Sequence, residues 1–194
     1  MDKKEKRTLK IEMRNAGESR KLVGTAIVYE SESEDMGFIE IIERGAATEA
    51  IEKSDARALF GHNSDTLLPL GRMSAGTLDV IETRSGVDIE IDPPDTQFAR
   101  DLAVAIERGD IQDMSFAFTV KDDSWETRNG KDYRVIKKFD ELLDFSFVTY
   151  PAYADTSVAL RNLKDRANSN SRSVSAAEDE DIEIQLTVNN EKEI

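Results

Sequence analysis

The sequence predicts an α+β protein that is mainly β: a small closed or partly closed β-barrel ringed by a few helices, with a flexible acidic C-terminal tail. Three observations predict this class. Short runs of alternating apolar and polar residues, interrupted by glycine, extend from Thr8 to about Leu163. One segment between Pro94 and Gly109 has the apolar spacing of a helix. The sequence then becomes polar and acidic, which indicates a domain over residues 1–163 and a tail over 164–194.

The expected strands follow one another along the body. Leu9, Ile11 and Met13 alternate with charged residues, and the apolar run at 22–29 suits a strand buried on both faces. Further strands are expected at 38–43, 113–120 and 141–150, with hairpins at 78–91 around residues 84–86 and at 125–135 around Asn129–Gly130. Many short strands with few helices favour a barrel.

Three segments are expected to form helices. Phe98, Leu102 and Ile106 recur every four residues between Pro94–Asp95 and Gly109, which predicts the clearest helix. A short helix is expected at 45–51, and a capped one at 155–163 could close the barrel.

Composition excludes several classes of protein. The 194 residues contain no cysteine, so disulfides and thiolate metal sites are excluded and a cytosolic protein is expected. A net charge of −14 argues against direct binding to nucleic acid. The chain has no apolar run long enough to span a bilayer and no apolar signal core, so neither a membrane protein nor a secreted one is expected.

The single histidine, His62, is the most informative residue for chemistry. Imidazole is the usual base of hydrolases that work near neutral pH, and no other imidazole is present. Without a thiol, a covalent mechanism would need a serine or threonine activated by His62. The ordinary alternative is a histidine that caps a strand end or packs at the surface.

A candidate nucleophile lies in the strand expected at 113–120. In a strand, Met114, Phe116 and Phe118 would face the core, and Ser115 would share the opposite face with small neighbours. That face would leave room for an approaching peptide beside Ser115. Alternatively, a face of small residues simply packs against another sheet or a helix.

A candidate carboxylate lies in the strand expected at 141–150. Leu143, Phe145 and Phe147 would share one face, which puts Asp144 and Ser146 on the other. Asp144 could orient the imidazole of His62 and stabilise the imidazolium, as the aspartate of a serine hydrolase triad does. An edge strand with a wet outer face would also tolerate an aspartate there.

Taken in order, these segments resemble the prohead proteases of tailed bacteriophages with HK97-like capsids. The resemblance covers nearly the whole body, and its specificity comes from the ordered set of motifs rather than from any one. The motifs are Gly24–Tyr29, Phe38–Ala46, Ala56–Asn63, Leu70–Arg72, Glu107–Ile111, Asp113–Phe118 and Leu143–Tyr153.

The resemblance implies a fold related to the herpesvirus assembly proteases, with His62 as base and Ser115 as nucleophile. The family commonly has glutamate where this chain has Asp144, so Glu141 and Asp140 remain alternatives for the third residue.

The resemblance implies that the protein is a serine endopeptidase. It would act inside the immature capsid, in the host cytoplasm. The enzyme would cut the scaffolding segment from the major capsid protein, and it would cut itself in the tail after Leu163. A homo-oligomer is possible. No cofactor, metal, nucleic acid or membrane is expected as a partner.

Two other classes remain open. One is an inactive, protease-like protein with a scaffolding or assembly role. The other is a metal-dependent hydrolase that uses His62 with Asp65 or nearby acids; with one histidine and no cysteine, its site would suit magnesium or calcium better than zinc.

Overall fold

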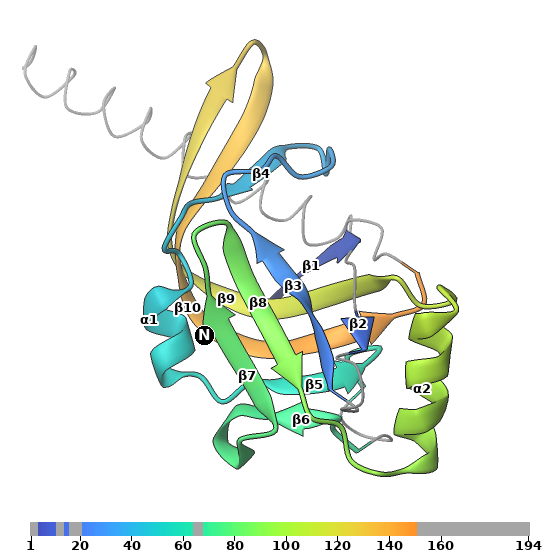
Figure 1. Ribbon diagram of the computed structural model, residues 1–194. Helices are drawn as coiled ribbons and strands as arrows, with labels where there is room; N and C mark the ends of the chain where they lie inside the picture. Colours follow the sequence, from blue (N-terminus) through green and yellow to red (C-terminus); the bar gives the residue numbers. More distant parts are fainter. Residues whose placement is uncertain (1–3, 11–13, 16–20, 64–67, 151–194) are drawn as a thin grey trace, which may run out of the picture. The chain divides into compact units, whose positions relative to one another are not determined.

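The computed structural model describes residues 4–10, 14–15, 21–63 and 68–150. The expected helix at 155–163, the boundary at 163/164 and the tail lie outside these residues. The described strands pair into two sheets (Figure 1). The first contains β1 (Glu5–Lys10), β9 (Asp113–Arg128), β10 (Lys131–Val148), β5 (Arg57–Phe60) and β6 (Gly71–Arg72) in that order, with β4 (Ile39–Ile42) also paired to β10. The second has the order β2 (Arg14–Asn15), β3 (Leu22–Val28), β8 (Gly86–Ile91) and β7 (Leu78–Glu82).

The mainly β class is confirmed, and a closed barrel is not. Among the described residues, no strand pairing joins the first sheet to the second. The alternation of apolar and polar residues could not distinguish the two architectures, because a barrel and a pair of stacked sheets both bury one face of each strand.

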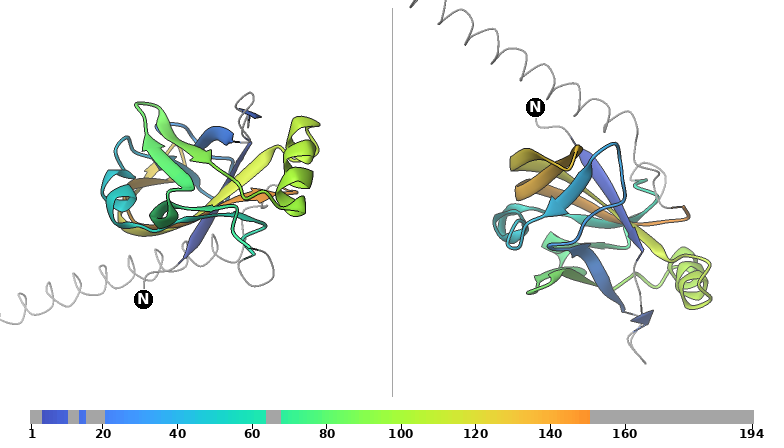
Figure 2. Two further views of the ribbon diagram at one scale, coloured as in Figure 1. Left: turned by 60° about the horizontal axis from the view of Figure 1, so that its bottom comes forward. Right: turned by 90° about the horizontal axis from the view of Figure 1, so that it is seen from above.

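Two α-helices and a short 3₁₀ turn, Met73–Ala75, complete the described part. The helices α1 (Thr48–Lys53) and α2 (Gln97–Glu107) lie at opposite ends of the pair of sheets (Figure 2). The clearest predicted helix is confirmed as α2, although it begins later than Pro94–Asp95. Thr96 caps it, because its Oγ1 accepts a hydrogen bond from the Ala99 backbone nitrogen at 3.3 Å.

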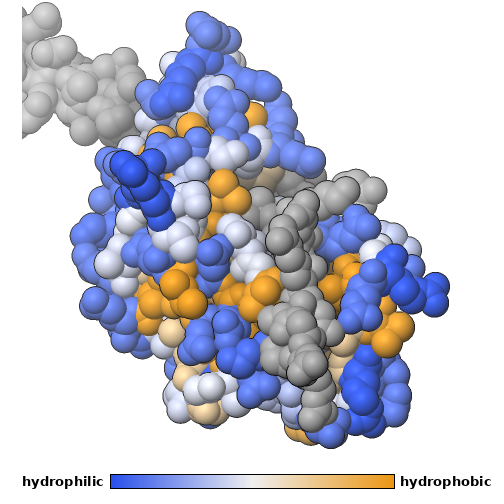
Figure 3. All heavy atoms as spheres, viewed as in Figure 1, coloured by the Kyte–Doolittle hydropathy of each residue, from blue (hydrophilic) through white to orange (hydrophobic). Residues whose placement is uncertain are grey.

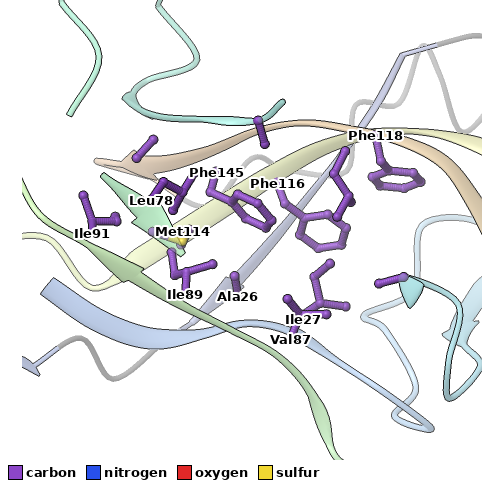
Figure 4. Packing of buried hydrophobic residues seen from close by; sticks show 14 of the residues in the cluster. Ala26, Ile27, Leu78, Val87, Ile89, Ile91, Met114, Phe116, Phe118 and Phe145 are labelled. Carbon is purple, nitrogen blue, oxygen red and sulfur yellow. The ribbon is translucent and has the colours of Figure 1, made fainter. Parts of the chain in front are cut away.

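The core lies between the sheets. Phe116, Phe118 and Phe145 of the first sheet point toward Ile27 and Ile89 of the second (Figure 4), and all five are almost completely buried. Met114, Phe116 and Phe118 therefore face the core as the sequence predicts, and Ser115 lies on the opposite face of the first sheet.

The longest strands, β9 and β10, form one hairpin. Asn129 and Gly130 connect them with φ of 51° and 78°, as the predicted two-residue turn requires. The segments expected as separate strands at 133–135 and 141–150 are thus one strand. The turn end of this hairpin is hydrophilic on the face shown in Figure 3.

Because of an irregularity in β10, the strand face predicted for Leu143 is wrong. Leu142 pairs with Phe118 and Asp144 with Ala117, so Leu143 is an extra residue in the register. Leu142, rather than Leu143, joins Phe145 and Phe147 in the core. The bulge shifts the alternation by one residue, which simple counting along the sequence cannot detect.

A buried cluster of charged side chains attaches β1 to the rest of the sheet. Arg134 of β10 donates to both carboxylate oxygens of Glu5, at 2.6 and 2.9 Å. Arg7 donates to both oxygens of Glu40 on β4, at 2.5 and 2.6 Å. Burial alone would raise the pKa of Glu5, but the hydrogen bonds and charge of Arg134, together with Arg7, lower it. Glu5 therefore stays ionised, and β1 is held by paired, fully hydrogen-bonded charges.

Candidate active site

Ser115 lies in the interior of the first sheet. It pairs with Thr8 of β1 on one side and with Ser146 of β10 on the other. Its side chain is on the face turned away from the second sheet, and the residue is completely buried.

Asp144 and Ser146 project from β10 on this same face. Asp144 pairs with Ala117 of β9 and with Arg57 of β5, so it belongs to an interior strand. It is 3% exposed. The alternative of a wet edge strand is therefore wrong for Asp144, and a buried carboxylate needs partners that offset its desolvation.

A tight turn after β5 places His62. The Gly61 nitrogen donates to the Phe147 carbonyl at 2.8 Å, and the Asn63 nitrogen to the Phe60 carbonyl at 3.1 Å. Gly61 and His62 have φ of 64° and 56°, the left-handed values that the two central residues of a type I′ turn require. This conformation is uncommon for a residue other than glycine, and such strain is found at functional sites.

His62 contacts Asp144 directly. Nδ1 of the imidazole lies 2.5 Å from Oδ1 of the carboxylate. A carboxylate only accepts, so the proton of this hydrogen bond belongs to Nδ1, and Nε2 carries the lone pair in the neutral ring. Nε2 is therefore the atom that could accept a proton from a substrate or a nucleophile.

Two further groups bind the same carboxylate. The Ser146 hydroxyl donates to Oδ1 at 2.7 Å, and Nζ of Lys4 donates to Oδ2 at 3.1 Å. Burial would raise the pKa of Asp144, but the hydrogen bonds from His62 and Ser146 and the nearby charges lower it below its ordinary value. Asp144 is thus ionised at neutral pH and can stabilise a positive charge on the imidazole.

Three buried side-chain atoms lack a hydrogen-bond partner among the described residues: Nε2 of His62, Oγ of Ser115 and Oγ1 of Thr119. Nε2 and Oγ of Ser115 are therefore not hydrogen-bonded to each other. Ser115 nevertheless lies opposite Ser146, at the spacing of about 5 Å between paired side chains on one face of a sheet. Ser146 in turn shares Oδ1 of Asp144 with His62. The structure thus gathers the three predicted site residues on one face of the first sheet.

The alternative carboxylates do not contact the imidazole. Asp140 forms an ion pair with Lys53 at 2.5 Å, and Glu141 is exposed. Asp65 lies outside the described residues. Within the described ranges, no group of three or more histidine or acidic side chains could hold a metal ion.

Sequence reasoning missed the contacts of Lys4 and Ser146 with Asp144. Ser146 had a signal, because it shares the Asp144 face two residues further along the strand. Lys4 had none, since 140 residues separate it from Asp144.

Comparison with known proteins identifies the family. The family model of caudovirus prohead serine proteases matches residues 7–170. Among solved structures, the capsid assembly protease gp21 of bacteriophage T4 matches with a TM-score of 0.46 and 14% identity, over 76% of this chain and 99% of that one. No curated protein matches the chain. In the part of the chain that the structure describes, no helix is long and apolar enough to cross a membrane. On the family match, the chain belongs to the caudovirus prohead serine proteases.

Proposed function

We propose that the protein is a serine endopeptidase whose nucleophile, base and orienting carboxylate are Ser115, His62 and Asp144. One observation carries the proposal. The only imidazole in the chain is held by a buried carboxylate on the same sheet face as a buried serine, and both Nε2 and the serine Oγ are free of other partners among the described residues. In a serine hydrolase the hydrogen bond between base and nucleophile is often loose until the substrate binds, and these two unpartnered atoms on one sheet face are compatible with that state.

The geometry supports an acyl-transfer mechanism. Oγ of Ser115 attacks the carbonyl carbon of the scissile peptide bond while its proton passes to Nε2 of His62. The imidazolium is stabilised by the Asp144 carboxylate and returns the proton to the leaving amine as the C–N bond breaks. In the second half, Nε2 of His62 takes a proton from a water molecule while its oxygen attacks the acyl carbon. The bond between that carbon and Oγ of Ser115 then breaks, and the imidazolium returns the proton to Oγ, which restores the serine hydroxyl.

The proposed substrate is the scaffolding segment of the major capsid protein, cut inside the immature capsid. Membership of the prohead protease family supports this assignment.

A fluorophosphonate probe tests the proposed site without knowledge of the cleavage sequence. Oγ of an activated serine attacks the phosphorus, fluoride leaves, and the hydroxyl proton passes to the base. We expect one adduct per chain, located by peptide mass spectrometry at Ser115 rather than Ser146. Purified protein should also cut the capsid protein that carries its scaffolding segment, and the probe should stop the cleavage.

The same experiment separates the other functional classes. An inactive, protease-like assembly protein would show neither adduct nor cleavage. A carboxylate-metal hydrolase would lose its cleavage activity when a chelator is added and would keep that activity after treatment with the fluorophosphonate probe. An adduct at another serine would contradict the assignment of Ser115.

Self-cleavage is a further expected outcome. The polar and acidic composition after Leu163 is typical of an exposed, cleavable segment. We expect incubated wild-type protein to lose mass from residues 164–194, and a Ser115→Ala protein to keep its full mass. Intact masses measured over time decide this, and two unchanged masses would exclude self-cleavage under those conditions.

A further inference from the structure

Lys4, immediately before β1, reaches across the sheet to the carboxylate of Asp144. Its Nζ lies 3.1 Å from Oδ2, while the lysine side chain is 47% exposed and the aspartate side chain 4%. Since β9 separates β1 from β10, the lysine side chain must pass over β9 on the face of Ser115. The residues of β9 on that face next to Ser115 are small, Ala117 and Thr119, so the crossing is unobstructed.

We propose that Lys4 is a positioning residue of the active site, which acts by holding Oδ2 of Asp144 so that Oδ1 stays directed at the imidazole of His62. This inference rests on the proposed function. It adds the residue immediately before β1 to the groups that position the proposed catalytic residues. His62 and Ser146 both use Oδ1, so Lys4 supplies the one described contact at the other oxygen. Without it, the carboxylate could turn about its Cβ–Cγ bond and lose alignment with Nδ1.

The anchoring of β1 supports a specific role for Lys4. Glu5, the next residue, receives two hydrogen bonds from buried Arg134, and Arg7 is fixed to Glu40. These contacts and the pairing of β1 with β9 hold the backbone beside Lys4 in place. The lysine therefore starts from a fixed position, although its side chain is half-exposed.

The other cations near Asp144 do not replace Lys4. Arg57 lies opposite Asp144 on β5, but its guanidinium is turned to Asp55, with Nη2 3.4 Å from Oδ2. Lys6 is on the same face of β1 as Lys4, opposite Ala117, and is exposed. Lys6 thus offers a matched control, with equal charge on the same strand and no contact with the carboxylate among the described interactions.

The test measures the rate of fluorophosphonate labelling of Ser115 against pH. We expect Lys4→Met to slow labelling roughly two- to fivefold at neutral pH, the effect of a partly exposed ion pair on a reacting group. Loss of the cation also stabilises the positive charge that forms on the imidazole, so the acidic limb of the pH profile should move to higher pH. Lys4→Arg should restore most of the rate, and Lys6→Met should leave the rate and profile unchanged.

Several outcomes would overturn the inference. A Lys4→Met profile that superimposes on the wild type shows that Lys4 is not a positioning residue, while labelling at Ser115 still supports the proposed function. An equal effect of Lys6→Met would indicate a general effect of surface charge. A lower melting temperature of Lys4→Met with no shift of the profile would indicate a purely structural role. Absence of labelling in the wild type would remove the proposed function and this inference together.

Discussion

Replacing Ser115 with alanine is expected to reduce the kcat for cleavage of the capsid protein by about 10⁶-fold, the effect of removing the nucleophile of a catalytic triad. The folded protein should be as stable as the wild type or slightly more stable. The Ser115 hydroxyl is buried without a hydrogen-bond partner among the described residues, and removing such a group costs no internal hydrogen bond. Cleavage kinetics and thermal unfolding of the same sample measure the two effects.

Thr119→Val is the matched control for this substitution. Thr119 lies four residues after Ser115 on the same face of β9. Its buried hydroxyl also has no hydrogen-bond partner among the described residues. It has no proposed part in the chemistry, so we expect its kcat for cleavage to stay within about twofold of the wild type. Substantial cleavage by Ser115→Ala protein would exclude Ser115 as the nucleophile.

The second large effect is expected for Asp144→Asn, which should lower kcat by about 10⁴-fold with little change in KM. An amide nitrogen placed against Nδ1 would force the imidazole into the other tautomer and leave Nε2 protonated, so it could not act as a base. Because the pKa of Asp144 is lowered on folding, its ionised form also stabilises the protein. That contribution is present above the pKa of the unfolded chain and is lost as pH falls through the pKa of the folded one.

Asp140→Asn provides the comparison on the same strand. Asp140 is paired with Lys53 and does not contact the imidazole, so its amide variant should keep near wild-type kcat. Single-turnover cleavage at neutral pH distinguishes the two variants. If Asp140→Asn lost as much activity as Asp144→Asn, or if the latter kept full activity, the assignment of the third residue would be wrong.

The sequence was most informative where composition left few choices. One histidine and no cysteine singled out His62 as a base. The alternation of large and small side chains around Ser115 predicted its face correctly, because β9 is regular there. Around Asp144 the same reasoning gave the correct face for the aspartate and the wrong one for Leu143, since the bulge between Leu142 and Asp144 interrupts the alternation.

What the sequence could not give was long-range register. The contact of Lys4 with Asp144 depends on the alignment of β1 with β9, which no local pattern encodes. The choice between a barrel and stacked sheets depends likewise on which strands meet at the sheet edges. The cluster of Glu5, Arg7 and Arg134 is equally hidden, because each member looks like an ordinary surface charge when only its neighbours in the chain are considered.

The pairing of the first strand with β9 has a consequence for the order of folding. In the chain, β1 precedes β9, the strand with which it pairs, by most of the body, so β1 leaves the ribosome long before β9 does. Bringing the ends of so long a loop together costs conformational entropy before any stabilising contact has formed. Docking of β1 on β9 should therefore be a late step in folding. His62, Ser115 and Asp144 likewise come from distant parts of the chain. A growing polypeptide therefore lacks the proposed catalytic site until Asp144 has left the ribosome, so the proposed self-cleavage would have to wait until then.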